Sequence, residues 1–417
     1  MNYKQTLLLT FIWMFFSVYG YTQITIGSDN KPATGSLLDI KENTNIGANA
    51  LKGLGLPRVK LTNLKPANPT QLASSIGSTG SWSMAEHIGL LIYNINEDFC
   101  ATPEPIYMGS HVWNGLEWEF LKDNRNPDVY TFTDPRDGES YTYRRFGESG
   151  IWMTQHMRAI IYSDGTPLDV HGGSSASNPT VKTYGYPGAA HPNWGVKPSA
   201  WKKEYGVFYN FPAATRDYAG FGASNQSQPD DSGIFGQYEV ESDTSLPTDY
   251  RGRHIVQGIC PDGWHVPSDR EWNELEREIY ENADKYSTYT TAEVASWNTT
   301  APWDPAWVAK EEARPTANTV NAHGNAMKSI CKVNTVVTKG KSRIAKEGGF
   351  DAPLVGHIYG TGTSSYGSHS FLTSSSIIAA NTRRGRSIAA GSAEVLRNTV
   401  NKGNLMPVRC KKNDLNP

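Results

Sequence analysis

The chain has 417 residues, enough for two or three domains with cores of their own. Its 39 Lys and Arg balance 41 Asp and Glu, and no long stretch has one dominant sign, which excludes a dedicated nucleic-acid-binding protein with a basic face. Only 19% of the residues are charged, whereas 39 Gly, 12 Trp and 21 Tyr favour a loop-rich, aromatic-rich fold over a helical bundle or a disordered chain.

The N-terminus predicts export. Lys4 precedes an apolar run over Leu7–Tyr19 that ends in small and polar residues, which is the pattern of a signal peptide spanning 1–23. This run is short for a membrane span and no second long apolar run follows, so we expect a mature chain without a transmembrane helix. An uncleaved N-terminal anchor is the alternative. The expected location is the cell surface or the medium, with the periplasm as the other extracytoplasmic option.

The cysteine count points the same way. In an exported protein an even number of cysteines favours disulfides over metal ligation or thiol catalysis, and none of these forms a C-x-x-C motif. Spacing alone leaves three pairings open among Cys100, Cys260, Cys331 and Cys410.

The N-terminal part reads as a small β-rich base. Residues 24–65 contain short apolar patches between Gly, Asn and Pro, and predict strands at Leu37–Ile40 and Arg58–Leu61. Since this extended segment cannot bury much by itself, we expect it to pack on another part or to form a homo-oligomer. Residues 66–87 are polar and rich in Ser and Gly, which predicts a loop or linker.

Two hairpins follow. In the base module at 88–127, Asn114-Gly115 predicts a type I′ turn, after which Leu116, Trp118 and Phe120 alternate with acidic residues and should line a buried face. The second hairpin places aromatic strands around the turn at 134–138, DPRDG. Its two acids would bind a structural calcium ion only with three further oxygen ligands, so a turn closed by glycine is the favoured interpretation.

One helix has a complete signature. Ser268 and Glu271 form a capping box after Pro267, which predicts a helix at 269–281. Its apolar stripe should be buried and consists of Trp272, Leu275, Ile279 and Tyr280. We expect His265 to be a hydrogen-bonding group of the core. Weaker patterns predict helices near Met153 and at 325–331, and residues 348–376 should form short strands and long loops.

Five segments together resemble the Fibrobacter succinogenes major paralogous domain, found in exported proteins of Fibrobacter and the Bacteroidetes. The resemblance spans about 128–412 and leaves a tail at 413–417. GICPDGWHVPSDREW at 258–272, which contains Trp264, is the most specific part. The segments are WMTQHMR (152–158), YGVFYNFPAA (205–214), VQGICPDGWHVPSDREWNEL (256–275), FLTSSS (371–376) and PVRCKK (407–412).

The resemblance implies a fold and a disulfide. The motif at 258–272 is similar in kind to a segment of the formylglycine-generating enzymes, which implies an α+β, C-type-lectin-like domain of short twisted antiparallel strands with a few helices. It also implies a Cys260–Cys410 bridge, because family members carry these two motif cysteines together. Cys100 and Cys331 then remain as a second pair.

Residues 24–122 resemble the segment that precedes surface modules in many Bacteroidetes proteins, which implies the stalk or base of a fibre or adhesin. Matching elements are Thr25-Ile26-Gly27, Leu37–Ile40 and the hairpin within Gly89–Trp118. The sequence departs from that pattern in one place, where an insert at 97–111, EDFCATPEPIYMGSH, brings Cys100 before the hairpin.

No motif of a nucleophile, a metal centre or a cofactor site is recognisable, so we assign no catalytic residue, no cofactor and no metal beyond the calcium alternative. The copper-binding cysteine pair of the formylglycine-generating enzymes has no counterpart. Scattered histidines, each interpreted as a surface or turn residue in preference to a metal ligand, are His156, His171, His191 and His254.

The aromatic stretch at 184–211 supplies the ligand-binding candidates, Asn193, Trp194 and Trp201, although most of its rings should fill the core. We therefore predict an exported, non-catalytic binding or adhesion protein whose lectin-like head recognises a glycan or a surface protein. Two alternatives remain: an exported hydrolase-type enzyme on the same fold, and a structural subunit of a fibre or fimbria.

Overall fold

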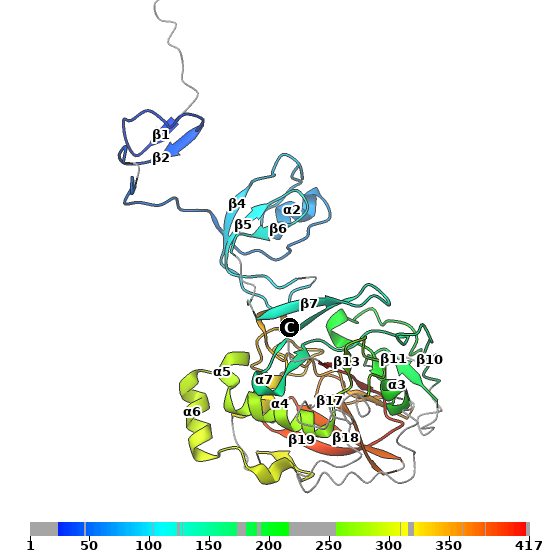
Figure 1. The fold of residues 1–417 in the computed structure, drawn as a ribbon. Helices are drawn as coiled ribbons and strands as arrows, with labels where there is room; N and C mark the ends of the chain where they lie inside the picture. The colour runs from blue at the N-terminus through cyan, green and yellow to red at the C-terminus, as the bar shows by residue number, and fades with distance from the viewer. Residues whose placement is uncertain are drawn as a thin grey trace, which may run out of the picture. The chain divides into compact units, whose positions relative to one another are not determined.

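A computed structural model of the chain describes residues 24–413, except for 46, 103, 123–125, 127, 173–180, 190–192, 217–255, 309, 316–320, 361 and 380. The predicted signal peptide at 1–23 lies outside the described residues. The chain divides into two units (Figure 1). The N-terminal unit comprises Met1–Thr62, Pro66–Ile95 and Met108–Glu119, and the C-terminal unit comprises Asn63–Lys65, Asn96–Tyr107 and Phe120–Pro417.

The described residues of the N-terminal unit form two small sheets and a short helix. Strands β1 (Ile24–Ile26) and β2 (Leu38–Ile40) pair in parallel. A four-stranded sheet has the order β3 (Arg58–Val59), β4 (Leu91–Asn94), β5 (Gly109–Trp113) and β6 (Trp118–Phe120). The two strands predicted in the extended segment therefore form, each shorter than expected.

The segment at 66–87 is not a simple linker, because helix α2 (Pro69–Ser75) forms within it. The side chain of Asn68 accepts a hydrogen bond from the backbone N–H of Gln71 at 3.0 Å, and Pro69 occupies the first helical position, where its missing N–H costs nothing. The indole of Trp118 donates to the hydroxyl of Ser75 at 2.9 Å. The helix is thus a packed part of the N-terminal unit.

The turn between β5 and β6 also differs from the prediction. Gly115 has a φ of 99°, but Asn114 is not left-handed; its side chain instead accepts hydrogen bonds from the N–H groups of Leu116 and Glu117. Leu116 is 82% exposed, so the expected buried position is wrong there. The buried face is formed by Trp113 and Trp118, whose rings lie 5.7 Å apart.

The C-terminal unit is a mixed α/β assembly of small sheets with few helices. One sheet has the order β13 (Trp264–His265), β21 (Lys411–Lys412), β9 (Ile151–Met153), β8 (Ser140–Arg145) and β7 (Val129–Thr133). A second has the order β14 (Ala313–Arg314), β19 (Val395–Asn401), β18 (Thr382–Ala389) and β17 (His369–Ala379). A third joins β10 (Asp169–Val170), β11 (Thr183–Gly185), β12 (Phe208–Tyr209) and β20 (Met406–Pro407), and β15 (His357–Tyr359) pairs with β16 (Gly362–Ser364).

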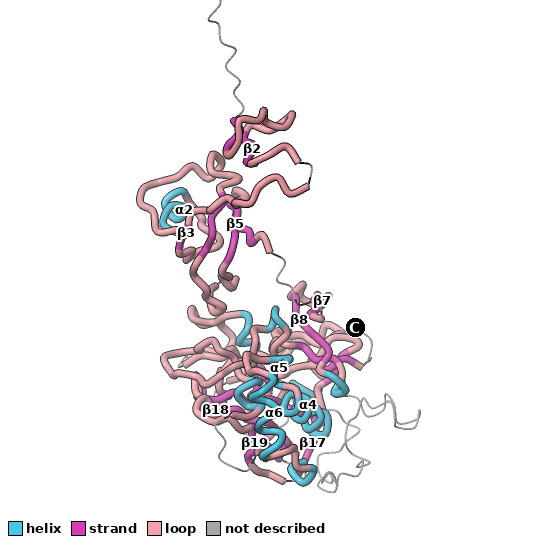
Figure 2. Tube along the Cα trace, turned by 90° about the vertical axis from the view of Figure 1, so that its left-hand side faces the viewer, coloured by secondary structure: helices cyan, strands magenta, loops and turns pink. Residues whose placement is uncertain are grey.

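Helix α4 (Asp269–Glu281) is the central helix of this unit and lies along the sheet of β17, β18 and β19 (Figures 1 and 2). The predicted capping box is present, and the predicted stripe is buried: Trp272, Leu275, Ile279 and Tyr280. Further α-helices in the described residues of this unit are α3 (Phe211–Thr215), α5 (Ala283–Tyr286), α6 (Thr291–Thr300) and α7 (His323–Met327). Single 3₁₀ turns include η2 (Lys203–Tyr205) and η5 (Ala345–Glu347).

Of the two helices predicted from weaker patterns, one is wrong and one forms with different bounds. The chain at Met153 is the buried strand β9, not a helix, whereas α7 forms near the predicted 325–331 but ends earlier. In the region 348–376, predicted to form short strands and long loops, β15 and β16 are short, whereas β17 is an 11-residue strand that continues to Ala379. Because all three residues of β9 are buried, its pattern lacks the alternation that distinguishes a strand.

The five segments that carry the resemblance meet in the core of the C-terminal unit. The ring of Trp152 lies 5.0 Å from that of Trp272, whose indole donates to the carbonyl of Thr373 at 3.0 Å. The N–H of Met157 donates to the carbonyl of Val408, and the N–H of Val207 donates to the carbonyl of Met157. Widely separated motifs therefore form one folding unit.

Both predicted disulfides are present. Cys260 and Cys410 are buried, with Cα atoms 5.9 Å apart, and Cys100 is bonded to Cys331 with a Cα separation of 5.4 Å. No cysteine is free. The second bridge has a particular topology: Cys100 lies in the loop that leaves β4 and returns to β5, yet residues 96–107 of this loop belong to the C-terminal unit.

Candidate functional site

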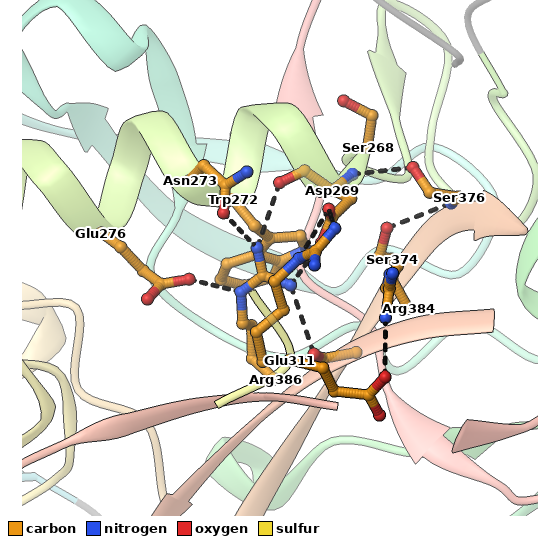
Figure 3. Close-up of polar contacts among 12 residues, drawn as sticks. Ser268, Asp269, Trp272, Asn273, Glu276, Glu311, Ser374, Ser376, Arg384 and Arg386 are labelled. Carbon is orange, nitrogen blue, oxygen red and sulfur yellow. Dashed lines mark hydrogen bonds and ion pairs between the residues drawn. The ribbon is translucent and has the colours of Figure 1, made fainter. Parts of the chain in front are cut away.

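A buried charge network fixes α4 to its sheet. Asp269, Asn273 and Glu276 project from one face of the helix toward Arg386 of β18 (Figure 3). The guanidinium of Arg386 donates to Asp269 Oδ1 at 2.5 Å and to Asn273 Oδ1 at 2.8 Å, and it also contacts the Glu276 carboxylate. From β19, Arg397 Nη2 reaches Asp269 Oδ2 at 2.6 Å.

The network keeps its acids ionised in spite of burial. Burial raises the pKa of Asp269, but the positive charges of Arg386 and Arg397 outweigh it, so the pKa lies well below the usual range. Glu276 behaves likewise beside Arg314 and Arg386. Since these carboxylates are inaccessible to solvent and already paired, they suit a structural role and not acid–base catalysis.

The motif FLTSSS completes the support of α4. Ser376 Oγ accepts a hydrogen bond from the N–H of Asp269 at 2.8 Å, at the helix start, and Ser374 Oγ accepts one from the N–H of Ser376. Figure 3 shows these two serines beside the N-terminal turn of the helix. At the same helix end, Glu271 accepts from His265 at 3.0 Å and pairs with Lys411 at 2.9 Å. His265 is thus the predicted core hydrogen-bonding group.

The C-terminal unit also contains a pocket of about 110 Å³. Its first wall is the 99–105 part of the insert, anchored by the Cys100–Cys331 bridge. Its other walls come from η2, from the segment after α7 and from the region of η5. The side chains that line it are Phe99, Thr102, Glu104, Pro105, Gln155, Lys202, Lys203, Glu204, Tyr205, Ser329, Lys332, Ile344, Lys346, Asp351 and Pro353, together with the two cysteines and two alanines.

The charged side chains of this pocket are four lysines and three carboxylates, those of Glu104, Glu204 and Asp351. Lys346 pairs with Glu104 of the insert, so the insert is tied to the pocket by an ion pair as well as by the disulfide. Within the described part of the chain, Lys202, Lys203 and Lys332 form no ion pair with a carboxylate. Burial raises the pKa of Asp351, which favours its neutral form. The pocket therefore offers unpaired cations beside apolar surface.

The apolar surface comes from Phe99, Tyr205, the proline rings and the disulfide. Tyr205 packs in an apolar core cluster that includes Phe208 and Leu405. Rings beside a few charged groups form the usual lining of a small-molecule site, in which the apolar faces supply contact area and the polar groups fix orientation.

The three residues predicted from the sequence to contact a ligand differ in burial. Trp194 is only 4% exposed and packs in the same cluster as Tyr205, so the expectation that it is a surface ring is wrong. Trp201 is half-buried, donates its indole N–H to the carbonyl of Gly206 at 2.9 Å and has Lys197 over its ring. Asn193 is exposed and its side chain accepts from the N–H of Gly195. None of the three lines the pocket, and a ligand contact by them stays a prediction.

The remaining candidates do not assemble into a site. His156 and His171 are buried, so their interpretation as surface or turn residues is wrong; they contact the backbone carbonyls of Tyr205 and Gly360. His191 and His254 lie outside the described residues. In the DPRDG turn, Arg136 binds both carboxylate oxygens of Asp134, which leaves that acid unsuited to calcium. No group of three His, Cys, Asp or Glu in the described ranges is arranged to bind a metal ion.

Sequence reasoning named none of the pocket residues as ligand contacts, since its candidates were Asn193, Trp194 and Trp201. The stretch at 184–211 supplies Lys202 to Tyr205, and the insert that breaks the expected base pattern supplies the wall around Cys100. Lys332 and the η5 region carried no signal, because they reach the pocket only through the tertiary fold. The single usable indication was the extra cysteine of the insert.

Two disulfides in a chain of small sheets and long loops fit an extracytoplasmic protein. The chain belongs to the family described as the Fibrobacter succinogenes major domain, which matches residues 148–412, more than half of its length. This surface-associated paralogous domain is the one that the sequence motifs resemble. Residues 25–133 match a phage tail like trimerisation region.

No curated protein and no solved structure matches the chain. Among the helices of the described residues, none is both long and apolar enough to cross a membrane.

Proposed function

We propose that the protein is an exported, non-catalytic binding protein of the cell surface, whose C-terminal unit recognises an acidic glycan. The observation that carries this proposal is the pocket in which Lys202, Lys203 and Lys332 lie beside the rings of Phe99 and Tyr205 and pair with no carboxylate of the described residues. A carboxylated sugar presents an anionic group and apolar C–H faces together, which complements such a lining.

The C-type-lectin-like fold is part of the proposal. Short antiparallel strands, few helices, long loops and a buried Cys260–Cys410 bridge all agree with it. In this arrangement the capped helix α4 and its charge network hold the scaffold, and the loops around it form the recognition surface.

The N-terminal unit acts as a trimeric base in this proposal, supported by the match to a trimerisation region. Three heads on one base raise the apparent affinity for a surface that displays many copies of the glycan, since later contacts are intramolecular. A weak single site is therefore sufficient for adhesion.

The test is binding of the mature chain to arrays of acidic and neutral glycans, followed by calorimetry with the best saccharide. The double variant Lys203→Ala/Lys332→Ala should bind at least about tenfold more weakly, which corresponds to about 1.4 kcal/mol of binding free energy. Binding by the wild type should weaken as the salt concentration rises. Lys310→Ala is the control, since Lys310 is exposed and pairs with Glu312 away from the pocket.

Equal binding of neutral glycans, or full affinity in the double variant, would contradict the proposed site. Turnover of a saccharide that disappears in Glu204→Gln would instead establish an enzyme, since Glu204 is a pocket carboxylate.

A further inference from the structure

The β1–β2 sheet has its apolar residues on the outside. Ile24 pairs with Leu38 and Ile26 with Ile40, and because alternate residues of a strand point to the same face, all four side chains share one face. They are 58%, 52%, 54% and 38% exposed, respectively. All four are therefore exposed aliphatic residues on one face of the sheet.

The opposite face of this sheet is polar and is the one that the chain covers. Asp39 accepts a hydrogen bond from the N–H of Ala33 at 2.8 Å and pairs with Lys41 at 2.6 Å. Lys41 is buried and also donates to the carbonyl of Lys31 at 2.7 Å. The loop between the strands therefore folds over the polar face, which inverts the usual arrangement of a soluble two-stranded sheet.

This inversion requires an apolar partner. An isolated two-stranded sheet is at best marginally stable in water, and a contiguous exposed aliphatic face marks an interaction site. On the opposite face Asp39 and Lys41 neutralise each other, and the four paired side chains of the aliphatic face themselves carry no charge that would select an acidic or basic partner.

We infer that the aliphatic face of β1–β2 is the contact through which three copies of this chain assemble. The occupant is a further copy of the chain, because both strands lie within or next to the matched trimerisation region at 25–133. In a closed three-fold ring each copy contacts two others, so three such faces turned toward the axis bury one another. The inference rests on the trimeric base of the proposed function and names its contact.

The experiment measures the mass of the mature chain by light scattering during size-exclusion chromatography. The wild type should be a trimer, and Ile26→Asp and Leu38→Asp should raise the dissociation constant more than about tenfold and give monomers. Leu116→Asp is the matched control, since Leu116 is also a highly exposed aliphatic residue of the N-terminal unit but lies in the turn after β5. It should stay trimeric.

A cross-linking variant provides a second test that does not depend on whether the aspartate variants fold. Ile40→Cys retains a neutral side chain, and mild oxidation should join its copies covalently, whereas Leu116→Cys should not cross-link. A wild-type monomer at all concentrations would overturn both this inference and the trimeric base. A trimer that persists in Ile26→Asp and Leu38→Asp, without cross-linking through Ile40→Cys, would overturn the inferred contact alone and leave the base intact.

Discussion

Replacing Asp269 by Asn should strongly destabilise the C-terminal unit, although the two side chains have nearly the same size and shape. The carboxylate receives Arg386 Nη1 at 2.5 Å and Arg397 Nη2 at 2.6 Å, and all three side chains are buried. The amide has no charge and only one acceptor oxygen, so two guanidinium groups would lose their main counter-charge without access to water. Removing one member of a buried pair costs about 3 to 5 kcal/mol.

Because folded proteins are stable by only about 5 to 15 kcal/mol, this loss is a large part of the total. Glu281→Gln is the control: Glu281 forms an i,i+4 pair with Arg277 at 2.9 Å on the partly exposed side of the same helix. Its loss should cost about 0.3 to 0.5 kcal/mol. Urea unfolding of the full chain at pH 7, followed by near-ultraviolet circular dichroism, measures both.

The pH dependence gives a second criterion. The pKa of Asp269 is lower in the folded state than its ordinary value of 3.8, so its contribution is fully present above that pH and is lost as the pH falls toward the folded-state pKa. The difference in unfolding free energy between wild type and Asp269→Asn should therefore be constant from pH 7 to 5 and shrink below about pH 4. Equal stabilities at pH 7 would refute the role of the network.

Three further substitutions test the helix cap of α4 and the burial of two tryptophans. Ser268→Ala should cost about 1 kcal/mol by removing the cap of α4, whereas Trp272→Ala should cost about 3 to 5 kcal/mol; urea melts in which Trp272→Ala is the milder change would contradict the packing described for this helix. Trp194→Ala should also lower stability by about 3 to 5 kcal/mol because its ring lies in the core, and a melting temperature equal to wild type would show that it is a surface ring.

Local signals were sufficient for some elements. Helix α4 carries both a capping box and an apolar stripe within 14 residues, from Ser268 to Glu281, so no tertiary information was needed. Helix α6 has a capping box too, between Thr290 and Glu293, but its buried side chains are only Val294 and Trp297, and without a stripe it was missed. Helix α2 was hidden by a polar composition, although Asn68-Pro69 is a start signal.

Other features depend on contacts that no local pattern contains. Glu276 occupies a position on α4 where a solvent-exposed charge is the default, and its burial is tolerable because Arg314, Arg386 and His323 reach it from elements distant in the sequence. The resemblance predicted the Cys260–Cys410 bridge, while Cys100–Cys331 followed by elimination. The burial of Trp194 was not predicted, because its polar sequence neighbours suggested a surface position.

The insert at 97–111 is where the N-terminal segment departs from the pattern of the base segments that it resembles. A loop between two strands of one unit is held in the other by the bridge from Cys100 to Cys331, 231 positions away, and by the ion pair of Glu104 with Lys346. Both fastenings lie at the wall of the lysine-lined pocket. For the proposed binding function, a loop without these two links would lose conformational entropy on each binding event, whereas a wall fixed by them is already ordered before a ligand binds. The second disulfide therefore serves the pocket more directly than it serves the core, which Cys260–Cys410 already secures.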